Sequence, residues 1–119
     1  MTYRAGRVGL AWLLVVFFVI GGIANIFALG GALEEYRRWG YPDWFHYVTG
    51  IMELTSAILM ALTTTRRIGS ALGAVVMVGA TLTVLSNSEY LHALLPLIVL
   101  FLLCLNFWLW SDRSGRRQS

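Results

Sequence analysis

The chain has 119 residues, of which 58% are hydrophobic and 13% are charged. Soluble domains carry about 25% charged residues, so this composition excludes a soluble globular protein, and the length leaves room for one domain. All nine basic residues are arginines, and they cluster at the ends of apolar segments. We therefore interpret the net charge of +3 as a signal of membrane orientation, and we expect no nucleic-acid partner.

The first apolar segment follows a short basic leader, Met1 to Arg7. Residues 8–29 are apolar apart from Asn25 and long enough to span a lipid bilayer. A basic leader and an apolar run also describe a signal peptide, but this run is longer than a typical signal core. We therefore expect a retained first helix.

The longest polar connection comprises residues 30–43. Within it, residues 32–39 predict a short interfacial helix, with its acids in the first turn and its arginines in the last, as the helix dipole favours. Gly40 is the expected C-terminal cap, and Pro42 prevents further winding. An aromatic belt is predicted at this membrane face, formed by Trp39, Tyr41, Trp44, Phe45 and Tyr47.

Three further helices are predicted, at about residues 44–62, 68–85 and 89–110, followed by a disordered basic tail over residues 111–119. Pro96 is predicted to kink the last helix. Gly69 and Gly73 form a GxxxG motif, which predicts a close contact with another helix of this chain or of a second copy. We expect the single cysteine, Cys104, to fill space in a helix core. The predicted fold is an all-α, integral membrane, antiparallel four-helix bundle in one domain.

The arginines predict the orientation of the bundle. Only Arg37 and Arg38 fall on one side of the predicted membrane. Seven arginines fall on the other side: Arg4, Arg7, Arg66, Arg67, Arg113, Arg116 and Arg117. The positive-inside rule therefore places both termini in the cytoplasm of a multi-pass protein of the cell membrane, the inner membrane in a bacterium.

Glu53 is the only acidic residue of the second apolar segment. It lies about nine residues, or roughly 13 Å, from the start of that segment, near the middle of a hydrocarbon core about 30 Å thick. An ionisable group at that depth is costly, so we expect it to face the interior of the bundle and to mark a functional site. Desolvation disfavours its charged form, so we expect a protonated carboxyl at neutral pH. The alternative is that Glu53 only stabilises the bundle by a hydrogen bond.

Further polar residues gather in the outer third of the predicted membrane. We select His46 and His92 as candidate catalytic residues beside Glu53. The candidate substrate-binding residues are Asn25, Tyr47, Thr83, Asn87 and Glu89. Each also has a structural interpretation, such as an interfacial ring, an interhelical hydrogen bond or a first-turn acid. The histidines and carboxylates lack the paired spacing of metal ligands, so we expect no metal site, and no cofactor motif is evident.

The chain resembles the DoxX-like membrane proteins, a group of small four-helix bundles. The resemblance rests on Gly21-Gly22-Ile23-Ala24-Asn25, on Gly40-Tyr41-Pro42, on Gly50-Ile51-Met52-Glu53-Leu54 and on the arginine turn at Arg66 and Arg67. Many members have a basic residue near the position of Asn25, so the resemblance does not predict a polar pair between Asn25 and Glu53. The family name comes from a subunit of an archaeal thiosulfate:quinone oxidoreductase.

The resemblance implies a component of a membrane oxidoreductase system that handles a lipid-soluble substrate, with a quinone as the candidate. Because the candidate polar residues gather in the outer third of the predicted membrane, we expect its pocket to open to the outer face. Glu53 would donate or accept the proton. Two alternatives stay open. One is a non-enzymatic subunit that anchors or stabilises a membrane complex, and the other is a cofactor-free isomerase or cyclase that uses Glu53 as its acid. The expected partners are the bilayer, a redox protein and a second copy of the chain.

Overall fold

The structure is a computed structural model that describes residues 2–118, with the side chains of residues 4–110. The described residues form five α-helices and two short 3-10 helices, with no strand. In chain order these are α1 (Thr2–Ile26), η1 (Leu29–Gly31), α2 (Ala32–Arg38), α3 (Phe45–Ala61), α4 (Arg66–Ser86), η2 (Tyr90–Ala93) and α5 (Leu94–Gln118). The prediction of an all-α fold is therefore confirmed, and α2 corresponds to the predicted interfacial helix.

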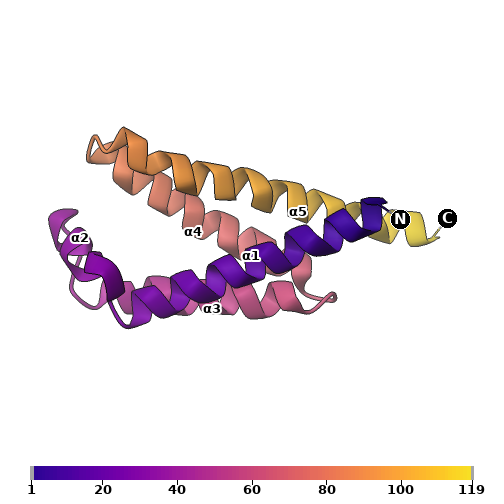
Figure 1. The fold of residues 1–119 in the computed structure, drawn as a ribbon, viewed down its shortest axis with the longest axis horizontal. Coiled ribbons are helices and arrows are strands. Elements are labelled where there is room, and N and C mark those ends of the chain that lie inside the picture. The colour runs from indigo at the N-terminus through magenta and orange to yellow at the C-terminus, as the bar shows by residue number, and fades with distance from the viewer. Residues whose placement is uncertain (1, 119) are drawn as a thin grey trace.

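The four long helices lie along the longest axis of an elongated bundle, as Figure 1 shows. Helix α1 runs beside α3, and α4 runs beside α5 (Figure 1). The two pairs diverge toward the end occupied by α2, and both ends of the chain lie at the opposite end (Figure 1).

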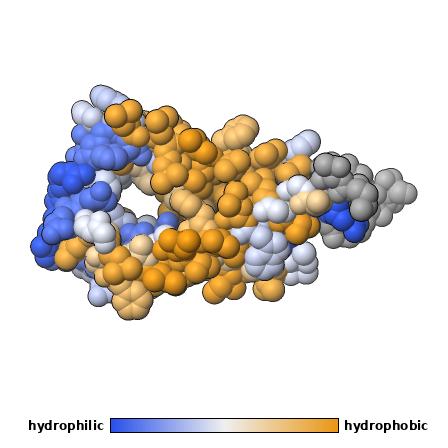
Figure 2. All heavy atoms as spheres, in the orientation of Figure 1, coloured by the Kyte–Doolittle hydropathy of each residue, from blue (hydrophilic) through white to orange (hydrophobic). Residues whose placement is uncertain are grey.

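Apolar side chains cover the middle of the molecule, whereas hydrophilic residues gather at the end that carries α2 (Figure 2). Many large apolar side chains are exposed, including Leu91 at 82% and Phe101 at 67%. Among the described residues, α1, α4 and the segment Tyr90–Trp110 are long and apolar enough to cross a membrane. The chain is therefore a multi-pass membrane protein. Helix α3 has 17 residues and falls below that length, so a fourth span stays a prediction.

Helix α1 differs from its predicted bounds at both ends. It begins at Thr2, so the predicted leader is part of the helix. It ends at Ile26, three residues earlier than predicted, because the following backbone enters the left-handed region at Ala28 (φ 53°), Gly30 (φ 62°) and Gly31 (φ 80°). Two glycines in succession make that conformation accessible and turn the chain into α2.

Three expectations about the last helix were wrong. Residues 90–93 form the 3-10 helix η2, and Pro96 then lies in the first turn of α5, where a missing N–H costs no hydrogen bond and causes no kink. The helical backbone continues to Gln118 through the predicted tail. Cys104 is exposed on the apolar surface and does not fill the core.

The predicted close contact at the GxxxG motif is confirmed, and it lies within one chain between α4 and α3. A Cβ atom at Gly69 would lie 2.6 Å from the backbone nitrogen of Met60, and one at Gly73 would lie 2.9 Å from Oγ of Ser56. The Ser56 hydroxyl donates a hydrogen bond of 2.7 Å to the carbonyl of Gly69. Only glycine permits such an approach of two helix backbones.

The apolar core fills the half of the bundle near the chain termini. Its fully buried members include Leu14 and Phe18 on α1, Met60 on α3 and Leu103 on α5. Among the described residues, no comparable cluster of large buried apolar side chains fills the other half, where the two helix pairs diverge. That half contains the candidate site.

Candidate functional site

A cavity of about 500 Å³ lies between the α1–α3 pair and the α4–α5 pair at the end that carries α2. Figure 2 shows an opening at this place, between the hydrophilic end and the apolar middle of the molecule. Small-molecule sites in proteins typically measure roughly 300–1,000 Å³. The apolar wall includes Phe17, Met52, Val76, Met77, Val84 and Leu95. The volume and the lining together suit a ligand with an apolar body.

Glu53 lines this cavity and is only 5% exposed, so it faces the interior as predicted. Its position depends on glycine in α1, because a Cβ atom at Gly21 would lie 3.1 Å from Oε2 of Glu53. Asn25 donates one hydrogen bond of 2.7 Å to Oε1 of Glu53 and another of 3.1 Å to the carbonyl of Gly21. The carboxyl is thus held against α1 by a neutral partner.

Asn25 is in turn fixed by two aromatic side chains. The Tyr36 hydroxyl on α2 donates a hydrogen bond of 2.8 Å to Oδ1 of Asn25. Burial is the main reason that the pKa of Tyr36 lies above its ordinary value of 10.0, so the hydroxyl stays a donor at neutral pH. His46 places Nδ1 2.7 Å from the backbone carbonyl of Asn25. A continuous line of hydrogen bonds therefore runs from Tyr36 through Asn25 to Glu53.

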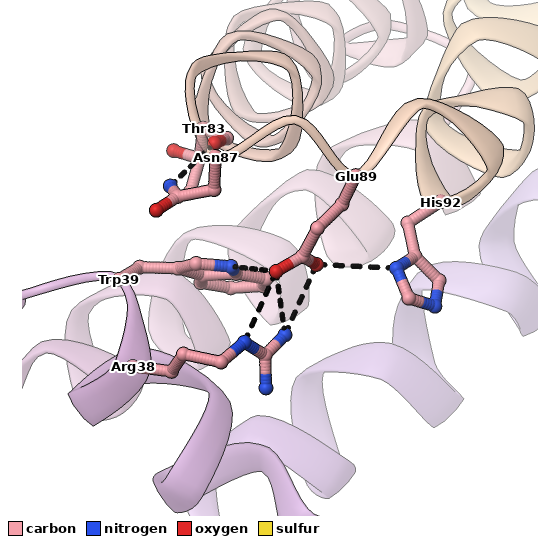
Figure 3. Close-up of polar contacts among 6 residues, drawn as sticks. All are labelled: Arg38, Trp39, Thr83, Asn87, Glu89 and His92. Atoms are coloured by element: carbon pink, nitrogen blue, oxygen red, sulfur yellow. Dashed lines mark hydrogen bonds and ion pairs between the residues drawn. The ribbon is translucent and has the colours of Figure 1, made fainter.

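Glu89 connects α2 to the α4–α5 pair at the mouth of the cavity (Figure 3). Its carboxylate accepts hydrogen bonds of 3.0 Å from Nε and from Nη2 of Arg38 and one of 3.2 Å from Nε1 of Trp39. Nδ1 of His92 lies 3.1 Å from Oε1 of Glu89. Partial burial alone would raise the pKa of Glu89, but the hydrogen bonds from Arg38 and Trp39 and the charge of Arg38 hold it below its ordinary value. Glu89 is therefore charged at neutral pH.

A second bridge to α4 lies beside this contact. The hydroxyls of Tyr41 and Thr83 are 2.7 Å apart. The Tyr41 ring stacks on Phe45 with a centroid distance of 4.7 Å, and both rings pack around Tyr36 at 6.2 and 6.0 Å. These three rings and Trp39 line the cavity, and together we call them the aromatic wall.

The structure brings half of the predicted site residues to the cavity. Those that line it are Asn25, Glu53, Thr83 and His92. The other four candidates are His46, Tyr47, Asn87 and Glu89, which do not line it. His46 is buried against α1, while Tyr47 is half exposed beside the His46 ring. Asn87 donates to the carbonyl of Thr83 at the end of α4 (Figure 3). Glu89 contacts two residues that line the cavity, Trp39 and His92, and it also contacts Arg38.

Three tyrosine and tryptophan residues of the cavity were not among the candidates: Tyr36, Trp39 and Tyr41. The sequence did show Tyr36 and Trp39 on one face of the interfacial helix, but it left open whether that face met lipid or protein. The left-handed Gly40 (φ 87°) turns the chain after α2 and brings Tyr41 beside Tyr36. Among the described residues, no group of three or more His, Cys, Asp or Glu side chains could hold a metal ion.

Comparison with known proteins gives a match to the model of the DoxX-like family over residues 9–106. The uncharacterized protein YdgD of Bacillus subtilis (strain 168) is 40% identical over 47 residues, which is 40% of this chain and 41% of that protein. The similarity thus spans about two fifths of the curated relative. No solved structure matches the chain.

Proposed function

The chain belongs to the DoxX-like family, and from this premise we propose that it is a component of a membrane oxidoreductase system that handles a lipid-soluble, quinone-like substrate. The observation that carries the proposal is the position of Glu53. Its carboxyl, held by Asn25, is the most buried ionisable group on the wall of a mainly apolar cavity. Such a site can hold an apolar body and present one acid to its polar head.

The proposed chemistry assigns the proton to the chain and the electrons to a partner. Reduction of a quinone to a quinol takes two electrons and two protons. Glu53 would supply a proton to one quinone oxygen, water would supply the proton for the other oxygen, and the two electrons would come from a redox partner protein. The hydroxyl of Tyr36 and the amide of Asn25 would keep the carboxyl oriented toward the substrate.

The cavity is proposed to open on the outer side of the membrane. Arg66 begins α4 at the end of the bundle that holds the chain termini, and Arg67 follows it. The cavity lies at the opposite end, beside α2. The positive-inside rule puts the arginine end in the cytoplasm, so the cavity would receive its substrate from the outer leaflet of the cell membrane.

A second candidate function uses the same carboxyl without electron transfer. A buried acid in an apolar cavity also suits a cofactor-free isomerase or cyclase that protonates an apolar substrate. Turnover of such a substrate by the isolated protein would favour this candidate. A co-purifying redox protein would favour the oxidoreductase component, or a subunit that only anchors that partner.

The proposal is tested by titrating a short-chain ubiquinone analogue into the protein in lipid nanodiscs. Trp39 lines the cavity, so its fluorescence should be quenched saturably, and Trp39→Phe should remove that signal. Glu53→Gln should retain the analogue but abolish proton-coupled reduction in the presence of the partner. Glu34→Gln, which changes an exposed acid of α2 that does not line the cavity, is the matched control. Absence of saturable binding to the wild type would contradict the proposal.

A further inference from the structure

We propose that this cavity selects lipophilic cations, with the Glu53 carboxylate as their counter-ion. The inference rests on the proposed function only in taking the cavity as a ligand site. It adds a second class of ligand, a lipophilic cation, to the neutral quinone-like substrate of the proposed function.

The ionisable residues that line the cavity are mostly acidic. Glu35 and Glu53 are both on its wall, and His92 is the one basic side chain among the described residues that line it. The side chain of His92 is 68% exposed and contacts Glu89. The two arginines of α2 are engaged elsewhere, Arg37 with Asp43 and Arg38 with Glu89. An anionic ligand would therefore find no basic partner in the lining except His92, whereas a cation would find two carboxyl groups.

The aromatic wall supplies a second attraction for positive charge. Ring faces attract a cation that lies within about 6 Å of the ring centroid. Tyr36, Trp39, Tyr41 and Phe45 all line the cavity, and their rings pack against one another at centroid distances of 4.7 to 6.2 Å. Quaternary ammonium groups are recognised by such groups of rings. Thus α2, α3 and the turn between them present four aromatic rings to a ligand in the cavity.

Glu53 has room for a cationic partner. Among the described residues, its hydrogen bond comes from Asn25 and engages Oε1. No arginine lines the cavity to neutralise the carboxylate, and the sequence contains no lysine. Asn25 and Tyr36 form a chain of donors that ends on the carboxyl and would stabilise its charged form. A bound cation would complete the charge balance.

A cation that binds in the cavity would replace the proton of the Glu53 carboxyl. In the empty cavity Glu53 is protonated, as expected for a carboxyl at this depth without a cation. Binding of a lipophilic cation forms the carboxylate–cation pair and releases one proton to water. The apolar body of the ligand would contact Met52, Val76 and Met77 on the wall. The chemical class of ligand is therefore a bulky amine or quaternary cation with apolar substituents.

The test compares tetraphenylphosphonium with tetraphenylborate, two ions of nearly the same shape and opposite charge, on the protein in nanodiscs of neutral lipid. We expect tetraphenylphosphonium to bind at least about tenfold more tightly than tetraphenylborate after subtraction of empty nanodiscs. In weakly buffered solution, its binding should release up to one proton per protein. Glu53→Gln should weaken tetraphenylphosphonium binding at least about tenfold and remove the proton release.

A pair of glycine variants tests whether the cation binds in the cavity. Gly79 lines the cavity, and a Cβ atom there would meet nothing within 4 Å, so Gly79→Phe should fill the space without disturbing the fold. Gly9 on α1 is equally open and does not line the cavity, so Gly9→Phe is the matched control. We expect the loss of tetraphenylphosphonium binding in Gly79→Phe alone.

Equal binding of the two ions would overturn the inference. Tetraphenylphosphonium binding that stays at wild-type affinity in each of the single variants Glu53→Gln and Gly79→Phe would also overturn it. If the short-chain ubiquinone analogue binds and tetraphenylphosphonium does not, the cation inference fails and the proposed function stands. If neither probe binds saturably, both fail.

Discussion

Asn25 on α1 donates a hydrogen bond of 2.7 Å to the Glu53 carboxyl on α3, across the wall of the cavity. The same amide accepts a hydrogen bond from Tyr36 on α2, so one side chain joins three helices. A neutral amide satisfies the buried acid without supplying a charge. The carboxyl is therefore held in the wall of the cavity by a hydrogen bond from a neutral side chain.

Two substitutions of Glu53 should distinguish the loss of its acidic group from the loss of its hydrogen bond with Asn25. Glu53→Gln keeps the acceptor that Asn25 needs, so the thermal unfolding temperature in detergent should stay close to that of the wild type. Glu53→Leu removes one of the two acceptors of the Asn25 amide nitrogen, which should lower the free energy of unfolding by about 1–3 kcal/mol. Equal unfolding temperatures for the two variants would show that the hydrogen bond does not stabilise the bundle.

The contact of α4 with α3 should not tolerate a large side chain at Gly73. A Cβ atom there would lie 2.9 Å from Oγ of Ser56 and 3.0 Å from Cζ of Phe18. Overpacking a core typically costs about 1–3 kcal/mol, so Gly73→Leu should lower the unfolding temperature and broaden the transition. Gly79→Leu, on the same helix but in open space, is the control and should unfold like the wild type. Equal stability of the two variants would contradict the close contact.

The contact of α2 with Glu89 should weaken in acid. The pKa of Glu89 in the folded protein lies below its ordinary 4.5, so the contact contributes stability above pH 4.5 and loses it as the pH falls through the lower folded value. Cys104 is first replaced by alanine so that only introduced cysteines react. Spin labels are then attached to Glu34→Cys on α2 and Leu91→Cys in η2, which are both exposed. They report the distance between α2 and η2 across the mouth of the cavity. The distance distribution should broaden at neutral pH in Glu89→Gln, and in the wild type only in acid.

Asp43→Asn is the control for that experiment. Asp43 pairs with Arg37 on α2, but both side chains are more than half exposed and the pair does not reach the α4–α5 pair. Its loss should leave the distance across the mouth unchanged. A distribution in Glu89→Gln that matches the wild type at neutral pH would show that Glu89 does not hold α2 in place.

The predicted topology can be checked by labelling single cysteines in intact cells. Glu34→Cys on α2 and Thr64→Cys in the turn before α4 are both exposed and lie at opposite ends of the bundle. An impermeant thiol reagent should label Glu34→Cys in unpermeabilised cells and should reach Thr64→Cys only after permeabilisation. The reverse pattern would place the cavity on the cytoplasmic side.

The sequence predicted the long helices and the interior position of Glu53, because apolar runs and an acid within one of them are local signals. The end of α1 was predicted too late, since the left-handed Ala28 gives no compositional sign. Gly69 and Gly73 were correctly placed at a close contact, because small residues at helical spacing permit it. The break at η2 was missed because Pro96 was interpreted as a kink within one helix, whereas it lies in the first turn of α5.

The cavity itself was harder to predict. Its wall depends on how α2 folds back over the divergent helix pairs, which brings Tyr36 and Trp39 against residues distant in sequence. Asn25 and Glu53 were selected separately, but their direct hydrogen bond was not predicted. Such a pairing depends on the register of α1 against α3, which the close approach of Gly22 and Gly50 sets.

The central claim is that a lipid-soluble molecule binds in the cavity beside Glu53. Photoaffinity labelling in nanodiscs with a short-chain quinone that carries a diazirine tests it most directly, with the labelled residues mapped by mass spectrometry. We expect label on cavity residues such as Met52 and Met77, and its loss in Gly79→Phe but not in Gly9→Phe. Label that spreads over lipid-facing residues such as Leu91 and Phe101, with the same pattern in both variants, would contradict the claim.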